Sequence, residues 1–192
     1  KWNAVEALAN IGPRAKDAIP SLLKTLDEPP GPDRNMRALV ANAVAKIGPD
    51  DPLVLKTLSA KLLEGDLMDA DAFANALGAI GKKALPRLLA ALRAPSISAN
   101  YAAVRALRKL GKDAAPAIPE LIVIANDKKR SGASPALRGG NLRNAAMRTL
   151  VEIAPDDKAV LASLNKIAAD TLDVPACTDA QAALKNVGKH LH

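Results

Sequence analysis

The chain has 192 residues and a net charge of +7, and 49% of its residues are hydrophobic but only 2% are aromatic. Ala, Leu, Ile and Val must therefore build the core, which suits closely packed helices better than a β-sandwich. No stretch approaches the roughly 18 uninterrupted apolar residues of a membrane-spanning helix, so we expect a soluble protein without membrane insertion. The single cysteine, Cys177, excludes an intrachain disulfide and is compatible with either cytoplasm or periplasm.

Apolar residues recur with the helical period of 3.6 along most of the chain, as at Leu39, Ala43, Val44 and Ile47. In chain order, this periodicity predicts helices at residues 2–11, 17–27, 34–47, 52–64, 69–80, 83–93, 98–110, 114–126, 141–153, 157–169 and 177–187. The first helix and every second one after it are called B helices, and the helices between them are called A helices.

One phrase recurs at the junctions of these helices: a B helix ends in an apolar residue and Gly, and an A helix with Pro in its first turn follows. It is clearest after Ile11, Ile80 and Leu110, and weaker copies follow Ile47, Ile153 and Val187. Gly can adopt the left-handed conformation that ends a helix, and Pro in a first turn loses only an N–H that has no helical partner. The intervals between these last apolar residues are 36, 33, 30, 43 and 34, and the longest contains an insertion at 127–140.

A single helical hairpin cannot bury its apolar face, so neighbouring hairpins must stack. The sequence therefore predicts an all-α fold, an α-solenoid in which about five hairpins stack into a superhelix. We expect one domain over residues 1–192, with repeat boundaries near 13, 49, 82, 112 and 155. Because the sequence opens at Lys1 inside a repeat, we expect a fragment of a longer protein, with Trp2, Val5 and Leu8 exposed.

The pattern resembles the bacterial HEAT-like repeats first grouped with phycobilisome lyases. Met36-Arg37 and Leu142-Arg143 match the Val-Arg dipeptide that opens the second helix in that family. The resemblance implies a right-handed α-solenoid, a superhelix of the HEAT-like or ARM type, with B helices that line its concave side. It leaves the function open because such repeats serve many roles. For Arg37 and Arg143 we expect a structural role, in which each side chain braces neighbouring repeats.

The positions two, five and nine residues before the last apolar residue share one face of each B helix. This face is mainly polar and carries two of the three aromatic residues, and Tyr beside Arg is a common interface anchor. The candidate partner-binding residues are Asn42, Asn75, Tyr101, Arg105, Arg108, Asn144 and Arg148. The alternative is that they are ordinary solvated side chains, with Asn residues that bond between adjacent repeats.

Charge is concentrated in residues 98–148, which hold ten basic and three acidic side chains, a net charge equal to that of the whole chain. Such a basic patch attracts an acidic protein surface or segment, a phosphate or a nucleic acid. Within it, Lys128, Lys129, Arg130 and Arg138 form a basic insertion loop, which we expect to be mobile and to touch a partner only in passing.

The inventory of reactive side chains disfavours catalysis. The two histidines, His190 and His192, lie at the end of the chain, so no Ser–His–Asp or Cys–His arrangement is available elsewhere. No Cys/His cluster supports zinc, and the acids between Glu64 and Asp71 lack the spacing of a Ca²⁺ loop. We expect these acids to cap helices, Cys177 to be a packing residue, and the chain to have no catalytic residue, metal or cofactor.

The sequence favours a non-enzymatic protein–protein interaction scaffold that binds a partner on the concave B-helix face. The alternative is a nucleic-acid-binding module that uses the basic patch at 98–148, although aromatic residues that stack on bases are scarce. Bilin-lyase activity is implied by the family's name alone, with no pocket residues to support it. A purely structural spacer also remains open, as do the oligomeric state and the compartment.

Overall fold

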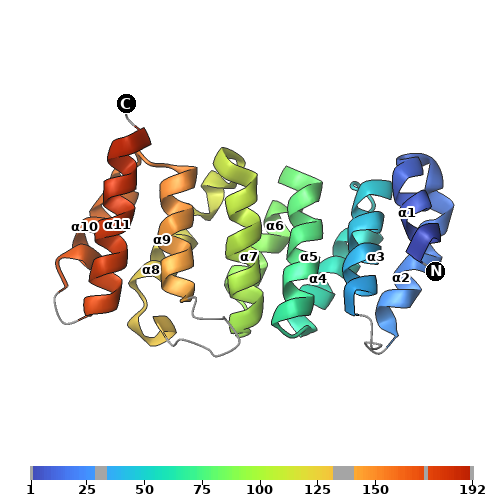
Figure 1. Ribbon diagram of the computed structural model, residues 1–192, viewed down its shortest axis with the longest axis horizontal. Coiled ribbons are helices and arrows are strands. Elements are labelled where there is room, and N and C mark those ends of the chain that lie inside the picture. The colour runs from blue at the N-terminus through green and yellow to red at the C-terminus, as the bar shows by residue number, and fades with distance from the viewer. Residues whose placement is uncertain (1, 29–33, 132–140, 171–172, 191–192) are drawn as a thin grey trace. The chain divides into compact units, whose positions relative to one another are not determined.

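The computed structural model describes residues 2–28, 34–131, 141–170 and 173–190, and these residues form helices and turns without any strand (Figure 1). The B helices are α1 (Trp2–Ile11), α3 (Arg34–Ile47), α5 (Leu67–Ile80), α7 (Ile97–Leu110), α9 (Leu142–Ile153) and α11 (Val174–His190). The A helices are α2 (Ile19–Asp27), α4 (Pro52–Glu64), α6 (Leu85–Leu92), α8 (Ile118–Asn126) and α10 (Lys158–Ala168). The predicted all-α class is confirmed.

Three A helices begin later than predicted, because short 3-10 segments precede them: η1 (Gly12–Ala18), η2 (Gly81–Ala84) and η3 (Gly111–Ala117). In each case the α-helix starts one residue before the proline of its first turn: Pro20, Pro86 or Pro119. A fourth 3-10 segment, η4 (Lys128–Ser131), occupies the start of the predicted insertion at 127–140, most of which lies outside the described residues.

Glycines end the B helices as the recurring phrase predicts. Gly12, Gly81 and Gly111 have φ angles of 66°, 86° and 57°, in the left-handed region that disfavours other residues. Gly48 serves a different purpose, because a Cβ atom there would lie 2.7 Å from Cδ1 of Ile19. Gly48 is therefore required by close packing, and its φ is not in that region.

Aspartates begin several helices. The side chains of Asp51, Asp66 and Asp157 each accept hydrogen bonds from two backbone N–H groups in the first turn of α4, α5 and α10, respectively. These bonds satisfy donors that have no partner within the helix. The predicted capping role of the acids near the start of α5 is thus confirmed for Asp66.

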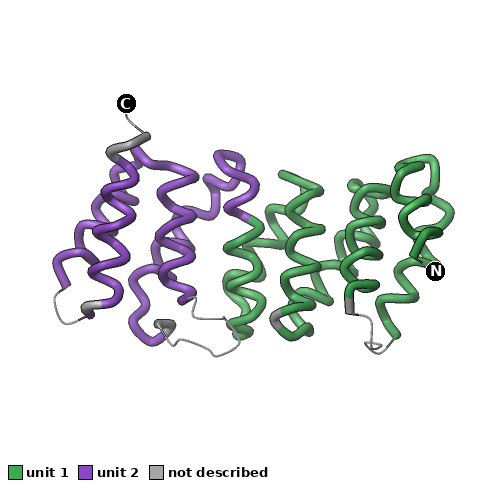
Figure 2. Tube along the Cα trace, in the orientation of Figure 1, with its two compact units in different colours: residues 1–106 green, residues 107–192 purple. Residues whose placement is uncertain are grey.

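The chain divides into two compact units, residues 1–106 and residues 107–192 (Figure 2). In the first unit, α3 packs between α1 and α5 in one layer, and α4 packs between α2 and α6 in the other. In the second unit, α9 packs on α11 and α8 packs on α10, and each A helix also contacts the B helix that follows it. Both units have the stacked hairpins expected of HEAT-like repeats, whereas the handedness, the number of repeats and the single domain stay predictions.

Leu and Ala side chains fill the space between the two layers. Leu58, Phe73 and Leu77 are fully buried in the first unit, and Leu121 and Leu150 are fully buried in the second. Core positions therefore follow the predicted periodicity, in which each hairpin covers the apolar face of its neighbour.

At the start of the chain, the predicted exposure of α1 is only partly confirmed. Trp2 is 38% exposed and Leu8 is half-buried, but the prediction for Val5 is wrong because Val5 is buried. The reason is that α1 packs against both α3 and η1, so that Val5 lies on a covered side of the helix.

Candidate functional site

Arg143 of α9 is the most deeply buried charged side chain among the described residues, with an exposed fraction of 2%. Its Nε donates to the carbonyl oxygen of Ala125 at 2.8 Å, near the end of α8, and its Nη1 forms an ion pair with Asp173. Hydrogen bonding from Arg143 holds the pKa of Asp173 below its ordinary value of 3.8. The guanidinium thus links three segments of the second unit, which confirms its predicted bracing role.

Arg37 of α3 acts in the same way within the first unit. Its Nη1 donates to the carbonyl oxygen of Glu28 at 3.0 Å, just after α2, and its Nε lies 3.2 Å from Oδ2 of Asp69 in α5, without hydrogen-bond alignment. The guanidinium carbon also lies 5.6 Å from the centroid of the Phe73 ring, within the range of a cation–π contact. The bracing role predicted for Arg37 is confirmed as well.

Asn100 and Cys177 occupy the position of Arg37 and Arg143, ten residues before the last apolar residue of the B helix. Nδ2 of Asn100 donates to three backbone carbonyls at the end of α6, at 2.7–3.1 Å, and the Cys177 thiol donates to the carbonyl of Ala168 at 3.0 Å. Sequence reasoning missed this role because it compared only the Arg-containing dipeptides. The spacing from the last apolar residue is the signal that identifies all four positions.

These bonds attach α3, α7, α9 and α11 to the A helices that precede them, and so help to set the solvent-facing side of these B helices. On that face, ion pairs connect neighbouring B helices. Arg105 pairs with Asp71 within the first unit. In the second unit, Nε of Arg108 donates to Oε2 of Glu152 at 2.8 Å. Both pairs are partly exposed, so their contribution to stability is small.

The candidate partner-binding residues are divided between the two units. Asn42, Asn75, Tyr101 and Arg105 belong to the first unit, and Arg108, Asn144 and Arg148 belong to the second. Asn42, Arg105, Arg108 and Arg148 are exposed, whereas Asn75, Tyr101 and Asn144 are half-buried. In the insertion, Lys128 forms an ion pair with Asp170 and Lys129 is exposed, while the Arg130 and Arg138 side chains lie outside the described residues.

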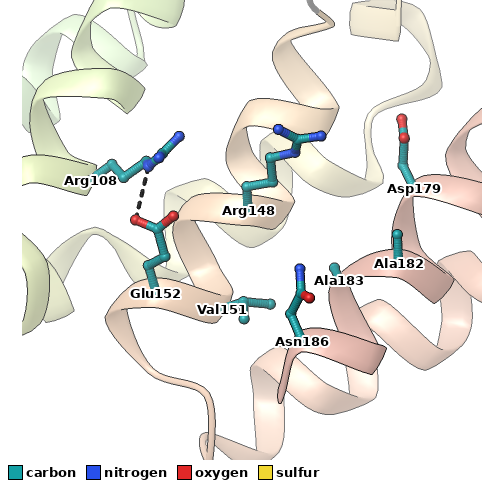
Figure 3. Close-up of a pocket in the computed structure, with 8 residues that line it drawn as sticks. All are labelled: Arg108, Arg148, Val151, Glu152, Asp179, Ala182, Ala183 and Asn186. Atoms are coloured by element: carbon teal, nitrogen blue, oxygen red, sulfur yellow. Dashed lines mark hydrogen bonds and ion pairs between the residues drawn. The ribbon is translucent and has the colours of Figure 1, made fainter. Parts of the chain in front are cut away.

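The second unit contains a cavity of about 390 Å³ on its B-helix face, between α9, α11 and the last turn of α7 (Figure 3). It is lined by Arg108, Arg148, Val151, Glu152, Asp179, Ala182, Ala183 and Asn186. The Arg108–Glu152 ion pair closes one side, and the Arg148 and Asp179 side chains rise from neighbouring helices on another. Small apolar side chains lie between these charged groups.

Arg148 and Asp179 differ from the other charged residues of this cavity. Neither makes an ion pair or a side-chain hydrogen bond with the part of the chain that the structure describes. With Arg108 and Glu152 paired to each other, the cavity carries one positive and one negative charge that have no partner among the described residues, and the formal charges of its lining sum to zero. Such an arrangement can bind an external carboxylate and an external hydrogen-bond donor at the same time.

Within the described ranges, no three His, Cys, Asp or Glu side chains gather in a way that could hold a metal ion. None of the helices in that same part of the chain is long and apolar enough to cross a membrane. Cys177 is half-buried and hydrogen-bonded through its sulfur to Ala168 and Gln181, in keeping with a packing role.

The family model of the PBS lyase HEAT-like repeat matches residues 1–28, which span α1, η1 and α2. This match confirms the predicted resemblance to HEAT-like repeats. Among curated proteins, no sequence matches the chain significantly. HEAT-like repeats generally mediate protein–protein interactions and are typically scaffolds without catalytic activity, although the description of the matched family includes the word lyase.

Proposed function

We propose that this chain is a non-enzymatic scaffold that binds a protein partner on its B-helix face. The observation that carries the proposal is the cavity of the second unit, where Arg148 and Asp179 lie beside small apolar side chains and are paired with no residue that the structure describes. Protein interfaces commonly combine an apolar centre with a few charged anchors, and Arg is enriched among the residues that dominate binding energy. Among the described residues, no His, Cys or Ser lines this cavity, which supports binding rather than nucleophilic chemistry.

Nucleic-acid binding is the second candidate, because residues 98–148 carry an excess of basic side chains. Ion pairing weighs against it. Within the part of the chain that the structure describes, at least four of these ten basic residues are paired with acids outside that segment: Arg105 with Asp71, Arg108 with Glu152, Lys128 with Asp170 and Arg143 with Asp173. A paired cation is less available to a phosphate, and the buried Arg143 cannot reach one.

Selection from a phage-displayed library of random twelve-residue peptides tests the leading proposal. The Arg148→Glu variant changes the B-helix face, and the matched control Lys158→Glu makes the same charge change at an exposed position of α10, an A helix. Peptides selected on the unmodified chain are expected to lose at least about tenfold in affinity for Arg148→Glu, because a charge contact that becomes buried on binding contributes this much or more. They are expected to bind Lys158→Glu normally.

If the selected peptides lose affinity equally for both variants, or keep full affinity for both, the choice of the B-helix face is contradicted. Filter binding of duplex DNA at about 50 mM salt tests the second candidate, because contacts to phosphate are strongest at low ionic strength. Measurable affinity that falls steeply as salt is added would favour nucleic-acid binding over the leading proposal.

A further inference from the structure

We infer that the cavity of the second unit selects a protein segment of mixed charge, with a carboxylate side chain for Arg148 and a Lys or Arg side chain for Asp179. This inference rests on the proposed protein-binding function and specifies the chemistry of the partner. It differs from the acidic partner that the sequence predicts, because the sequence shows the excess of basic residues without showing which of them are already paired.

The sequence repeats the arginine of the Arg105–Asp71 ion pair at Arg148 without repeating its acid. Arg105 stands five residues before the last apolar residue of α7. It pairs with Asp71, which stands nine residues before the last apolar residue of α5. Arg148 occupies the position of Arg105 in α9. The position of Asp71 is held by Tyr101 in α7, which has no negative charge to offer. Thus α9 has an arginine at the position of Arg105, but α7 has no acid at the position of Asp71.

Arg148 is well suited to an external carboxylate. The guanidinium group presents parallel N–H donors that match the two oxygens of a carboxylate, and such charge-assisted bonds are stronger than neutral ones. The neighbouring carboxylate of Glu152 is already bonded to Arg108, so it does not compete for this role. Figure 3 shows the Arg148 side chain extending from α9, with Asp179 on the neighbouring helix.

The opposite wall is one face of α11. Asp179, Ala182, Ala183 and Asn186 are spaced by three, four and seven residues from the first, so they line a single side of the helix. The two alanines leave room for a chain to approach closely, and the Asn186 amide offers both a donor and an acceptor to a peptide backbone. Asp179 supplies a negative charge at the end of this face nearest to Arg148 (Figure 3).

A segment with charges of only one sign fits this cavity poorly. An all-acidic segment would meet Arg148 but would place a like charge beside Asp179, and an all-basic segment would have the opposite conflict. A segment that carries both charges can pair its acid with Arg148 and its base with Asp179. Like-charge contacts reduce the affinity of segments that carry charges of only one sign.

Three pools of synthetic nine-residue peptides in the same Ala/Ser/Gln background test this inference by fluorescence polarisation. One pool carries a Glu and a Lys separated by two to four residues in both orders, one carries two Glu, and one carries two Lys. The mixed pool is expected to bind the unmodified chain at least about tenfold more tightly than either other pool, and Arg148→Gln and Asp179→Asn are each expected to remove most of that preference.

Exchange of the two charges gives the sharpest result. The mixed peptide that binds best has one order of Glu and Lys along its chain. The double variant Arg148→Glu/Asp179→Arg is expected to prefer the peptide with the reversed order, which a general loss of stability cannot produce. Both residues lie at the surface or half-buried, and circular dichroism checks that the variants keep their helices.

Several outcomes overturn the inference. If the all-acidic pool binds as tightly as the mixed pool and Asp179→Asn strengthens binding, the cavity is an anion site, and the protein-binding proposal survives. The same conclusion follows if phage selection yields peptides that depend on Arg148 but lack the mixed pair. If neither the pools nor the phage library yields a binder on the B-helix face, the proposed function fails together with the inference.

Discussion

The thiol of Cys177 donates to the carbonyl oxygen of Ala168, nine residues earlier in the chain, in the same way that Asn100 donates to Ala91. Both donors stand ten residues before the last apolar residue of a B helix, and both acceptors lie at the end of the preceding A helix. The last carbonyls of an α-helix have no helical partner, so a donor from the next helix satisfies them and fixes the hairpin angle. Arg, Asn and Cys can all supply that donor.

Replacement of Asn100 tests this anchoring. Asn100→Leu keeps the approximate size of the side chain and removes all three donated bonds. Because the acceptors are largely shielded from water, we expect a loss of about 2–3 kcal/mol in the free energy of unfolding, measured by urea denaturation. The control Cys177→Ser retains a donor and is expected to change stability by less than about 1 kcal/mol. Equal effects of the two substitutions would contradict the anchoring role.

The Arg143–Asp173 pair predicts a specific pH dependence. The pKa of Asp173 is lowered by its hydrogen bond from Arg143, so the pair adds stability above the ordinary value of 3.8 and loses it as the pH falls through the lowered pKa. Asp173→Asn leaves Arg143 buried without an anion, and we expect a loss of about 2–3 kcal/mol at pH 7.

The difference between the unmodified chain and Asp173→Asn is expected to shrink below about pH 4, as the carboxylate gains a proton. Thermal unfolding followed by circular dichroism from pH 7 to pH 2 measures it. A difference that is constant over this range would show that the charge of Asp173 is unimportant and that only its geometry at the start of α11 matters.

Two glycines three residues apart should respond oppositely to the same substitution. Gly81 has a φ of 86°, so Gly81→Ala forces a strained backbone, and we expect a loss of about 1–2 kcal/mol. Gly78 lies inside α5, where an added Cβ would meet Ala106 at an ordinary distance of 3.5 Å. Gly78→Ala should therefore stabilise the chain by up to about 1 kcal/mol through helix propensity. Calorimetry distinguishes the two, and a matching sign for both substitutions would refute this explanation.

Thr149 is a polar exception in a row of alanines. It lies four residues before the last apolar residue of α9, and the other B helices have Ala7, Ala43, Ala76, Ala106 and Ala183 at that position. Its hydroxyl oxygen is buried and has no hydrogen-bond partner among the residues that the structure describes. Thr149→Val should raise the free energy of unfolding by about 1 kcal/mol, whereas Thr149→Ser keeps the hydroxyl and should lower it. Destabilisation by Val would indicate that the hydroxyl has a partner.

The local signals of helix ends and helix faces made most of the fold predictable. Ile80-Gly81 and Leu110-Gly111 place helix ends correctly, because an apolar residue followed by Gly reports a local backbone requirement. Asp66 was predictable as a cap for the same reason. The burial of Val5 was not predictable, because it depends on how α1 and α3 pack, and that angle is a tertiary property.

The candidate site was less accessible from the sequence. The face that includes Arg108 and Arg148 follows from helical spacing, and both residues line the cavity of the second unit. Asp179 and Asn186 were missed because they stand eight residues and one residue before Val187, outside the positions that were counted in each B helix. The neutralisation of Arg105 by Asp71 could not be foreseen, since pairing of side chains 34 residues apart depends on the register between helices.

Chemical-shift mapping on the isotope-labelled chain, with the tightest-binding selected peptide as probe, tests the central claim most directly. We expect the perturbed backbone amides to cluster in α9 and α11 around Arg148 and Asp179, with α8 and α10 unchanged. Perturbations confined to the A helices, or to residues 1–106, would contradict the assignment of partner binding to this cavity.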